Sequence, residues 1–175
     1  LGALANNGGP TRTHALLAGS PALDRGDVST ALVNDQRGSG FARLIGGRVD
    51  IGAFEQQAPT PTVNLTVNNS SISEGGGTAT FTATLPNVAA FDVTVTLSFS
   101  GTTTFPGDYT RTGTQILIPA GSLTGSVSVT AVQDTYSESA ETIIATIQSL
   151  TNASVGMSSS ATTSIANDDG VPAFT

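Results

Sequence analysis

Hydrophobic and polar residues alternate along most of the chain after residue 62. Val63, Leu65 and Val67 are separated by polar residues, and the same alternation returns in six later runs. Because successive side chains of a β-strand point to opposite faces, such a run predicts a strand with one buried face and one polar face. The predicted strands cover residues 63–67, 79–85, 93–99, 116–118, 127–131, 143–147 and 163–165.

Turn-forming residues separate these runs. They occur at 75–77 (GGG), 86–87 (PN), 106–107 (PG) and 119–121 (PAG). Gly, Pro and Asn are the residues that tight turns favour. About seven short strands in about 110 residues predict an all-β fold, an antiparallel, immunoglobulin-like β-sandwich over residues 63–169.

The first 57 residues follow a different pattern. Alternation is weak there, and glycine turns are dense, as at 6–10 (NNGGP) and 37–40 (RGSG). A segment of this size buries little surface by itself. We therefore predict a separate domain at 1–57, a Pro/Thr linker at 58–62, the sandwich at 63–169 and a further linker at 170–175. The chain begins at Leu1 without a leader, so we expect it to be a piece of a longer protein.

Charge divides the chain at the same place. The formal net charge is −7, with 6 basic and 13 acidic residues. Residues 1–57 are balanced, with five Arg and five acids, whereas residues 58–175 carry one base, Arg111, and eight acids. This balance argues against a nucleic-acid-binding surface. No apolar stretch is long enough to insert in a membrane, and the absence of Cys excludes thiolate chemistry and disulfides.

Seven of the eight acids in the second segment fall at predicted strand ends or turns, and strand ends of a sandwich converge at two poles. Their carboxylates are either solvated loop charges or ligands gathered around a cation. Hard divalent cations such as Ca²⁺ take about six to eight oxygen ligands, and without one such a cluster repels itself. The candidate metal ligands are Glu74, Asp108, Asp134, Glu138, Glu141, Asp168 and Asp169.

The second segment resembles a Calx-β domain, the calcium-binding sandwich of sodium/calcium exchangers that also occurs in bacterial adhesins. The resemblance lies in the order and spacing of 71–75 (SISEG), 107–109 (GDY), 118–121 (IPAG), 132–141 (VQDTYSESAE) and 165–169 (IANDD). It implies calcium binding at one end of the sandwich by the same seven acids. Gln133 and Asn167 stand where the exchanger has Asp, so the resemblance implies fewer ions, one or two, and weaker affinity.

The first segment resembles the closing part of a right-handed parallel β-helix of large bacterial surface proteins. The residues that carry the resemblance are 7–11 (NGGPT), 13–17 (THALL), 19–24 (GSPALD), 35–38 (DQRG) and 47–55 (GRVDIGAFE). It implies the terminal coils or cap of such a helix, and it transfers no catalytic role to these positions.

Together these features predict a non-enzymatic, calcium-binding structural or adhesive module of a large secreted or cell-surface bacterial protein, such as a component of an array or filament. The expected partners are calcium and either a further copy of the chain or another surface protein or glycan. Two alternatives stay open. One is an accessory fragment of a β-helix polysaccharide-degrading enzyme whose active site lies upstream, and the other is a calcium-responsive regulatory module.

Overall fold

The computed structural model describes residues 1–30, 32–45, 47–57, 60–89 and 91–170. Contacts divide the chain into two compact units, Leu1–Pro59 and Thr60–Thr175. Residues 58 and 59 of the predicted linker 58–62 lie outside the described residues, and so do residues 171–175 of the predicted linker 170–175. No helix among the described residues has the length and apolar character needed to cross a membrane.

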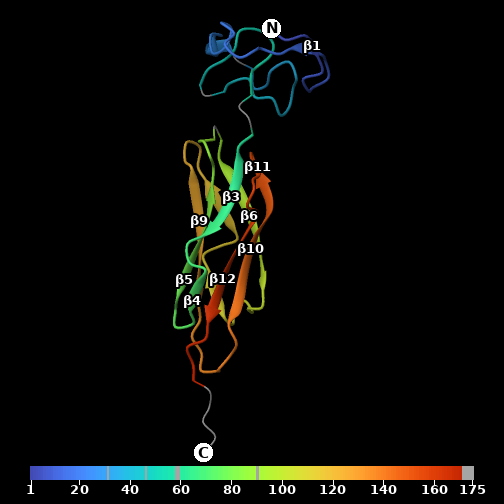
Figure 1. The fold of residues 1–175 in the computed structure, drawn as a ribbon. Helices are drawn as coiled ribbons and strands as arrows, with labels where there is room; N and C mark the ends of the chain where they lie inside the picture. The colour runs from blue at the N-terminus through green and yellow to red at the C-terminus, as the bar shows by residue number, and fades with distance from the viewer. Residues whose placement is uncertain (31, 46, 58–59, 90, 171–175) are drawn as a thin grey trace, which may run out of the picture. The chain divides into compact units, whose positions relative to one another are not determined.

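The second unit is a β-sandwich of two five-stranded sheets (Figure 1). In one sheet the order is β4-β12-β10-β6-β8, and in the other it is β11-β3-β5-β9-β7. The strands are β3 (Thr62–Val67), β4 (Ser71–Ser73), β5 (Thr78–Thr84), β6 (Val93–Gly101), β7 (Tyr109–Arg111), β8 (Gln115–Ile118), β9 (Thr124–Ala131), β10 (Glu141–Thr151), β11 (Ser154–Val155) and β12 (Ser160–Ala166).

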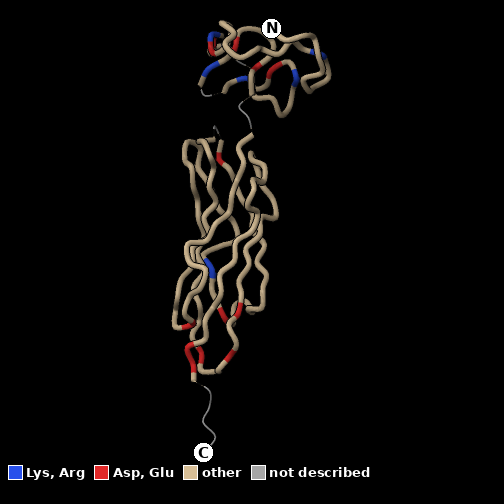
Figure 2. The backbone as a smooth tube through the Cα atoms, in the orientation of Figure 1, with Lys and Arg blue, Asp and Glu red and all other residues tan. Residues whose placement is uncertain are grey.

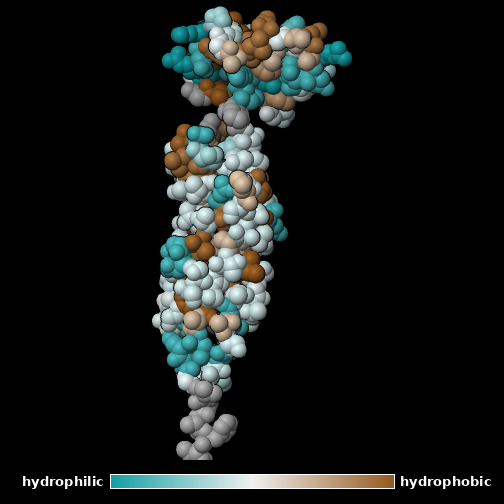
Figure 3. All heavy atoms as spheres, viewed as in Figure 1, coloured by the Kyte–Doolittle hydropathy of each residue, from teal (hydrophilic) through white to brown (hydrophobic). Residues whose placement is uncertain are grey.

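Alternating burial produces the core between the sheets. In β5, for example, Ala79, Phe81 and Ala83 are fully buried, whereas the Thr residues between them face outward. Each of the seven predicted strands overlaps an observed one, namely β3, β5, β6, β8, β9, β10 and β12, and the prediction 79–85 extends one residue beyond the end of β5. The strands β4, β7 and β11 were not predicted, because two or three residues are too few to show alternation. Because the residues between the buried ones are mostly Thr and Ser, the outer faces of the two sheets are rich in these residues. Figure 3 accordingly shows mostly intermediate hydropathy on the visible face of the sandwich.

The sandwich is not purely antiparallel, which corrects the prediction from sequence. Strand β4 pairs parallel with β12, and β11 pairs parallel with β3. Both exceptions are short edge strands formed where the chain crosses from one sheet to the other. After β3 the chain leaves its sheet and adds β4 to the edge of the opposite sheet, where it runs in the direction of β12.

The register of the strands places four connections at one pole of the sandwich. Glu141 at the start of β10 pairs with Ile165 near the end of β12, and Ala166 pairs with Ser73 at the end of β4. In the other sheet, Tyr109 at the start of β7 pairs with Ala131 at the end of β9. The β4–β5 turn, the β6–β7 loop, the β9–β10 loop and the segment after β12 therefore meet at this pole, which we call the acidic pole.

The first unit contains little regular structure. Its strands β1 (Leu4–Ala5) and β2 (Thr13–His14) pair antiparallel, and its helix η1 (Val28–Thr30) is one 3-10 turn. Two isolated bridges are also antiparallel. The described residues of this unit show no coil of a parallel β-helix, so the structure does not support that prediction. Gly8 and Gly9, with φ values of 92° and 76°, lie in the connection between β1 and β2, which reverses the chain so that the two strands pair antiparallel.

A buried ionic network stabilises the first unit. Arg37 lies between the rings of Phe41 and Phe54, with its guanidinium carbon 4.1 and 3.9 Å from the two centroids. The same guanidinium donates to Asp35 Oδ2 at 2.6 Å and to the Glu55 carbonyl oxygen at 2.6 Å. Leu16 and Val49 are the buried hydrophobic residues among the described part of this unit. Charge pairing and cation–π contacts therefore take much of the place of an apolar core.

Candidate metal centre

All seven acids predicted as metal ligands lie at the acidic pole. Figure 2 shows acidic segments gathered at this end of the sandwich. Four separate connections supply them: the β4–β5 turn, the β6–β7 loop, the β9–β10 loop with the first residue of β10, and the segment after β12. In that order the residues are Glu74; Asp108; Asp134, Glu138 and Glu141; and Asp168 and Asp169.

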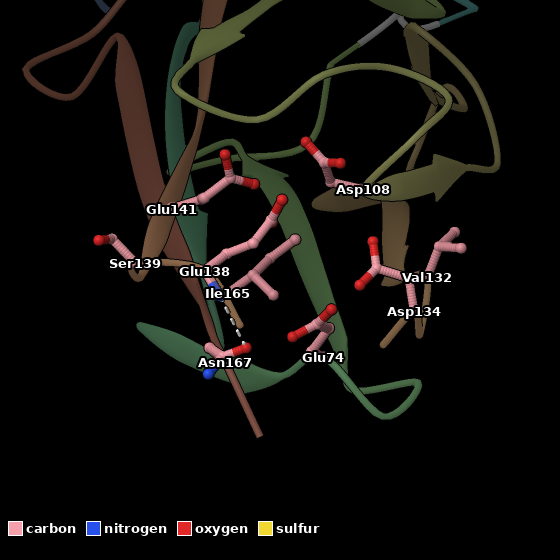
Figure 4. A pocket seen from close by; sticks show the side chains of 9 residues that line it. All are labelled: Glu74, Asp108, Val132, Asp134, Glu138, Ser139, Glu141, Ile165 and Asn167. Carbon is pink, nitrogen blue, oxygen red and sulfur yellow. Dashed lines mark hydrogen bonds between the residues drawn. The ribbon is translucent and has the colours of Figure 1, made fainter. Parts of the chain in front are cut away.

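Asp108, Glu138 and Glu141 form the first carboxylate cluster. Each offers an oxygen that lies within 4.8 Å of the others. Figure 4 shows their side chains pointing toward one another from different segments, with Glu138 between Asp108 and Glu141. Asp108 and Glu141 are half-buried, and Glu138 is exposed. Three carboxylates at this spacing provide the oxygen-rich environment that a hard divalent cation requires.

Glu74, Asp168 and Asp169 form the second cluster, also with oxygens within 4.8 Å of one another. Glu74 is only 6% exposed. Asp169 Oδ2 is buried and has no hydrogen-bond partner. A buried carboxylate oxygen without a donor is costly, because it loses its hydration without compensation. A cation near Asp169 would remove this cost.

A small cavity joins Glu74 to the first cluster. Figure 4 shows its lining, which includes the carboxylates of both Glu74 and Asp134. Asp134 belongs to neither cluster by distance, and its Oδ1 accepts a hydrogen bond from the Tyr136 amide at 2.7 Å. The other lining residues are Asp108, Val132, Glu138, Ser139, Glu141, Ile165 and Asn167.

Backbone contacts position the Asp108 carboxylate. The Asp108 amide donates to the Thr104 carbonyl at 2.9 Å, and the Val132 amide donates to the Asp108 carbonyl at 2.9 Å. The Thr104 amide donates to Asp108 Oδ2. These bonds fasten the β6–β7 loop both to itself and to the chain that follows β9.

Asn167 is a site residue that the candidate list from sequence omitted. Its Oδ1 accepts from the Glu138 amide at 3.2 Å, and its Nδ2 donates to the Asp169 carbonyl at 2.9 Å. It thus links the β9–β10 loop to the segment after β12. The resemblance had placed Asn167 at a ligand position of the exchanger, which was the signal that could have included it.

No basic residue forms an ion pair with these acids among the described residues. The two ion pairs found there, Arg37–Asp35 and Arg43–Glu55, belong to the first unit. Arg111, the base of the sandwich, stacks its guanidinium carbon 4.1 Å from the Phe105 ring centroid and 5.0 Å from that of Phe99. The negative charge of the pole is therefore not neutralised by side chains that the structure describes.

The pKa values of three acids at the acidic pole, Glu141, Glu74 and Asp168, depart from their ordinary values. Burial raises the pKa of Glu141 to about 7, and the nearby carboxyls of Asp108, Glu138 and Glu74 add to the rise. Burial also raises the pKa of Glu74, with further contributions from Asp134 and Asp169. By contrast, hydrogen bonds from Gln133 and Ser73 lower the pKa of Asp168. Without a cation, the acidic pole therefore disfavours the ionised forms of Glu141 and Glu74.

Comparison with known proteins identifies the class to which this sandwich belongs. The model of the LapA domain family matches residues 60–168, and the chain therefore belongs to this family. No curated protein matches the chain.

Solved structures with a similar fold include Calx domains. The chain resembles CBD12 from CALX1.2, with a TM-score of 0.53 and 14% identity over 61% of this chain and 45% of that one. It also resembles the apo form of the Calx CBD1 domain, with a TM-score of 0.52 and 14% identity over 61% of this chain and 99% of that one. The chain thus spans less than half of the CBD12 structure. The similarity establishes a Calx-β-like sandwich fold for the second unit.

Proposed function

We propose that the sandwich is a calcium-binding structural module of a large secreted or cell-surface bacterial protein. One observation carries this proposal: acids from four separate connections come together at one pole, and basic side chains described in the structure do not pair with them. Bringing several carboxylates together costs free energy unless a cation offsets their repulsion. Calcium binding is the role that accounts for their position.

Calcium fits the donor set better than other common cations. All the candidate ligands are oxygens, which excludes the softer metals that prefer thiolates and imidazoles. The donors come from four separate connections, and Ca²⁺ tolerates irregular geometry where Mg²⁺ does not. One of the solved structures with a similar fold is a calcium binding domain, CBD12 of CALX1.1. We propose one or two ions per chain, held by Glu74, Asp108, Asp134, Glu138, Glu141, Asp168 and Asp169.

The bound ions would act mechanically. They would tie together loops that are far apart in the sequence, and so stiffen the acidic pole. Extracellular calcium-binding modules have dissociation constants of about 0.1–1 mM, so a site of this strength would stay occupied outside the cell. Such a module serves as a spacer or an adhesive element, alone or as part of an array or filament whose partner is another copy, a surface protein or a glycan. A dissociation constant in the micromolar range would instead favour a calcium-responsive regulatory module.

Thermal melting of the full chain tests the proposal. The melting temperature of the sandwich should fall in chelator and return with added calcium. At a calcium concentration about 100 times the dissociation constant the difference should be about 10 °C. The same titration with magnesium should give a much smaller rise. An identical melting curve in chelator and in calcium would contradict the proposal. Depolymerisation of a polysaccharide by this chain would contradict a non-enzymatic module.

A further inference from the structure

Asp168 has its hydrogen-bonding capacity largely satisfied by neutral protein donors. Its Oδ1 accepts from Gln133 Nε2 at 3.1 Å. Its Oδ2 accepts from Ser73 Oγ at 3.0 Å and from the Gly75 amide at 3.2 Å. Gln133 Nε2 also donates to the Asp134 carbonyl oxygen at 2.8 Å. Three segments that are distant in the sequence therefore meet at this one carboxylate without an ion.

Gly75 makes this close approach possible. A Cβ at position 75 would lie 2.9 Å from Asp168 Oδ2 and 3.2 Å from Gln133 Oε1, which is closer than carbon and oxygen atoms normally pack. The absence of a side chain at Gly75 allows both its amide and the Asp168 carboxylate to reach hydrogen-bonding distance. The turn after β4 therefore packs closely against the Asp168 carboxylate.

The other two members of the second cluster differ from Asp168. Asp169 Oδ2 is buried without a partner. Glu74 is buried as well, and the burial and the neighbouring acids act against its ionised form. These two carboxylates gain from a cation, whereas Asp168 would have to share or give up existing hydrogen bonds to bind one.

We infer that Asp168 is a latch and not a calcium ligand: together with Gln133, Ser73 and the Gly75 amide, it fastens the end of β12 to the β4–β5 turn whether or not calcium is bound. The calcium titration that tests this inference rests on the proposed function. The inference removes Asp168 from the proposed set of calcium ligands. Calcium is then held by Glu74, Asp134, Asp169 and the acids of the first cluster, and the latch keeps the segment after β12 in place when calcium leaves.

Alanine variants of the full chain separate the two roles. In chelator, Asp168→Ala and Gln133→Ala should each lower the melting temperature by several degrees. The double variant should lose less than the sum of the two single losses, because the Gln133–Asp168 bond is already broken in each single variant. In a calorimetric titration at physiological salt, Asp168→Ala should keep the wild-type number of ions and change the dissociation constant by less than about threefold, since Asp168 does not coordinate the ion and its exposed charge is partly screened.

The matched control is Glu141→Gln, a change at a proposed ligand. It should show the opposite pattern, with calcium affinity lowered by more than about tenfold and no loss of melting temperature in chelator. If Asp168→Ala behaves like Glu141→Gln, Asp168 is a ligand and the latch is wrong. Additive losses of melting temperature in the double variant would also overturn the latch. If the wild-type chain binds no calcium, the proposed function fails, but the coupling between positions 133 and 168 in chelator still decides the latch.

Discussion

The carboxylates of Asp108 and Glu141 offer oxygens within 4.8 Å of each other, although the two residues lie at the starts of strands in different sheets, one just before its strand and one within it. Asp108 lies directly before β7, and Glu141 is the first residue of β10. No element of the main chain requires two acids at this position. Because burial and the neighbouring Asp108 both disfavour the ionised form of Glu141, this carboxyl makes the stability of the ion-free protein depend on pH.

Lowering the pH should stabilise the ion-free sandwich through Glu141. Its pKa is about 7 in the folded protein, above the ordinary value of 4.5 expected after unfolding. The folded state therefore binds the proton more tightly, and the resulting stability is present below about pH 4.5 and lost as the pH rises to about 7. In chelator, the melting temperature of the wild type relative to Glu141→Gln should fall as the pH is raised through this window.

Calcium supplies the control for this measurement. A bound ion favours the ionised carboxylate, so saturating calcium should reverse the difference and make the wild type more stable than Glu141→Gln at pH 7.5. A constant difference between the two proteins from pH 5 to pH 7.5 in chelator would show that Glu141 ionises normally in the folded state.

Two neighbouring isoleucines test the strand register at the acidic pole. Ile143 is fully buried in the core, whereas Ile144 points to the other face of β10 and is half-buried. Replacing a buried Ile by Ala typically costs about 2–5 kcal/mol of unfolding free energy. We expect Ile143→Ala to show a loss in this range in urea unfolding and Ile144→Ala a clearly smaller one. A larger loss for Ile144→Ala would mean that β10 is placed one residue out of register, and equal losses would contradict the burial difference between its two faces.

The ionic network of the first unit should depend strongly on Arg37. Arg37→Met keeps much of the side-chain length but leaves Asp35 buried without its partner, and breaking a buried pair in this way costs about 3–5 kcal/mol. We expect the first unit to become sensitive to limited proteolysis, while calcium-dependent melting of the sandwich stays as in the wild type. Arg48→Met, at an exposed position, is the matched control. Similar proteolysis of the two variants would contradict a stabilising role for the network.

Much of the sandwich was predictable, because alternation reports directly on strands that have one buried face. The runs around Phe81 and Ile143 became β5 and β10 for this reason. The short strand β7 escaped prediction, since three residues carry no periodic signal. The parallel pairing of β4 with β12 could not be predicted, because it depends on where the chain crosses between sheets and not on local pattern.

The convergence of the acids at one pole was also predictable in outline. Their places at strand ends required only that the connections lie at the same end of the sandwich. What the sequence did not reveal was how differently the individual carboxylates are surrounded. Asp168 and Asp169 are adjacent and chemically identical, yet one accepts three hydrogen bonds and the other has a buried oxygen without a partner. Such differences arise from tertiary contacts, here with Gln133 and the β4–β5 turn.

The most direct test of the central claim is a calorimetric titration of the ion-free chain with calcium, for the wild type and for Asp108→Asn and Asp92→Asn. Asp92 precedes β6, at the end of the sandwich opposite the acidic pole. We predict saturable binding of one or two ions to the wild type and to Asp92→Asn, and a loss of affinity of about tenfold or more for Asp108→Asn. No heat of binding to the wild type, or the same binding curve for all three proteins, would contradict a calcium site at the acidic pole.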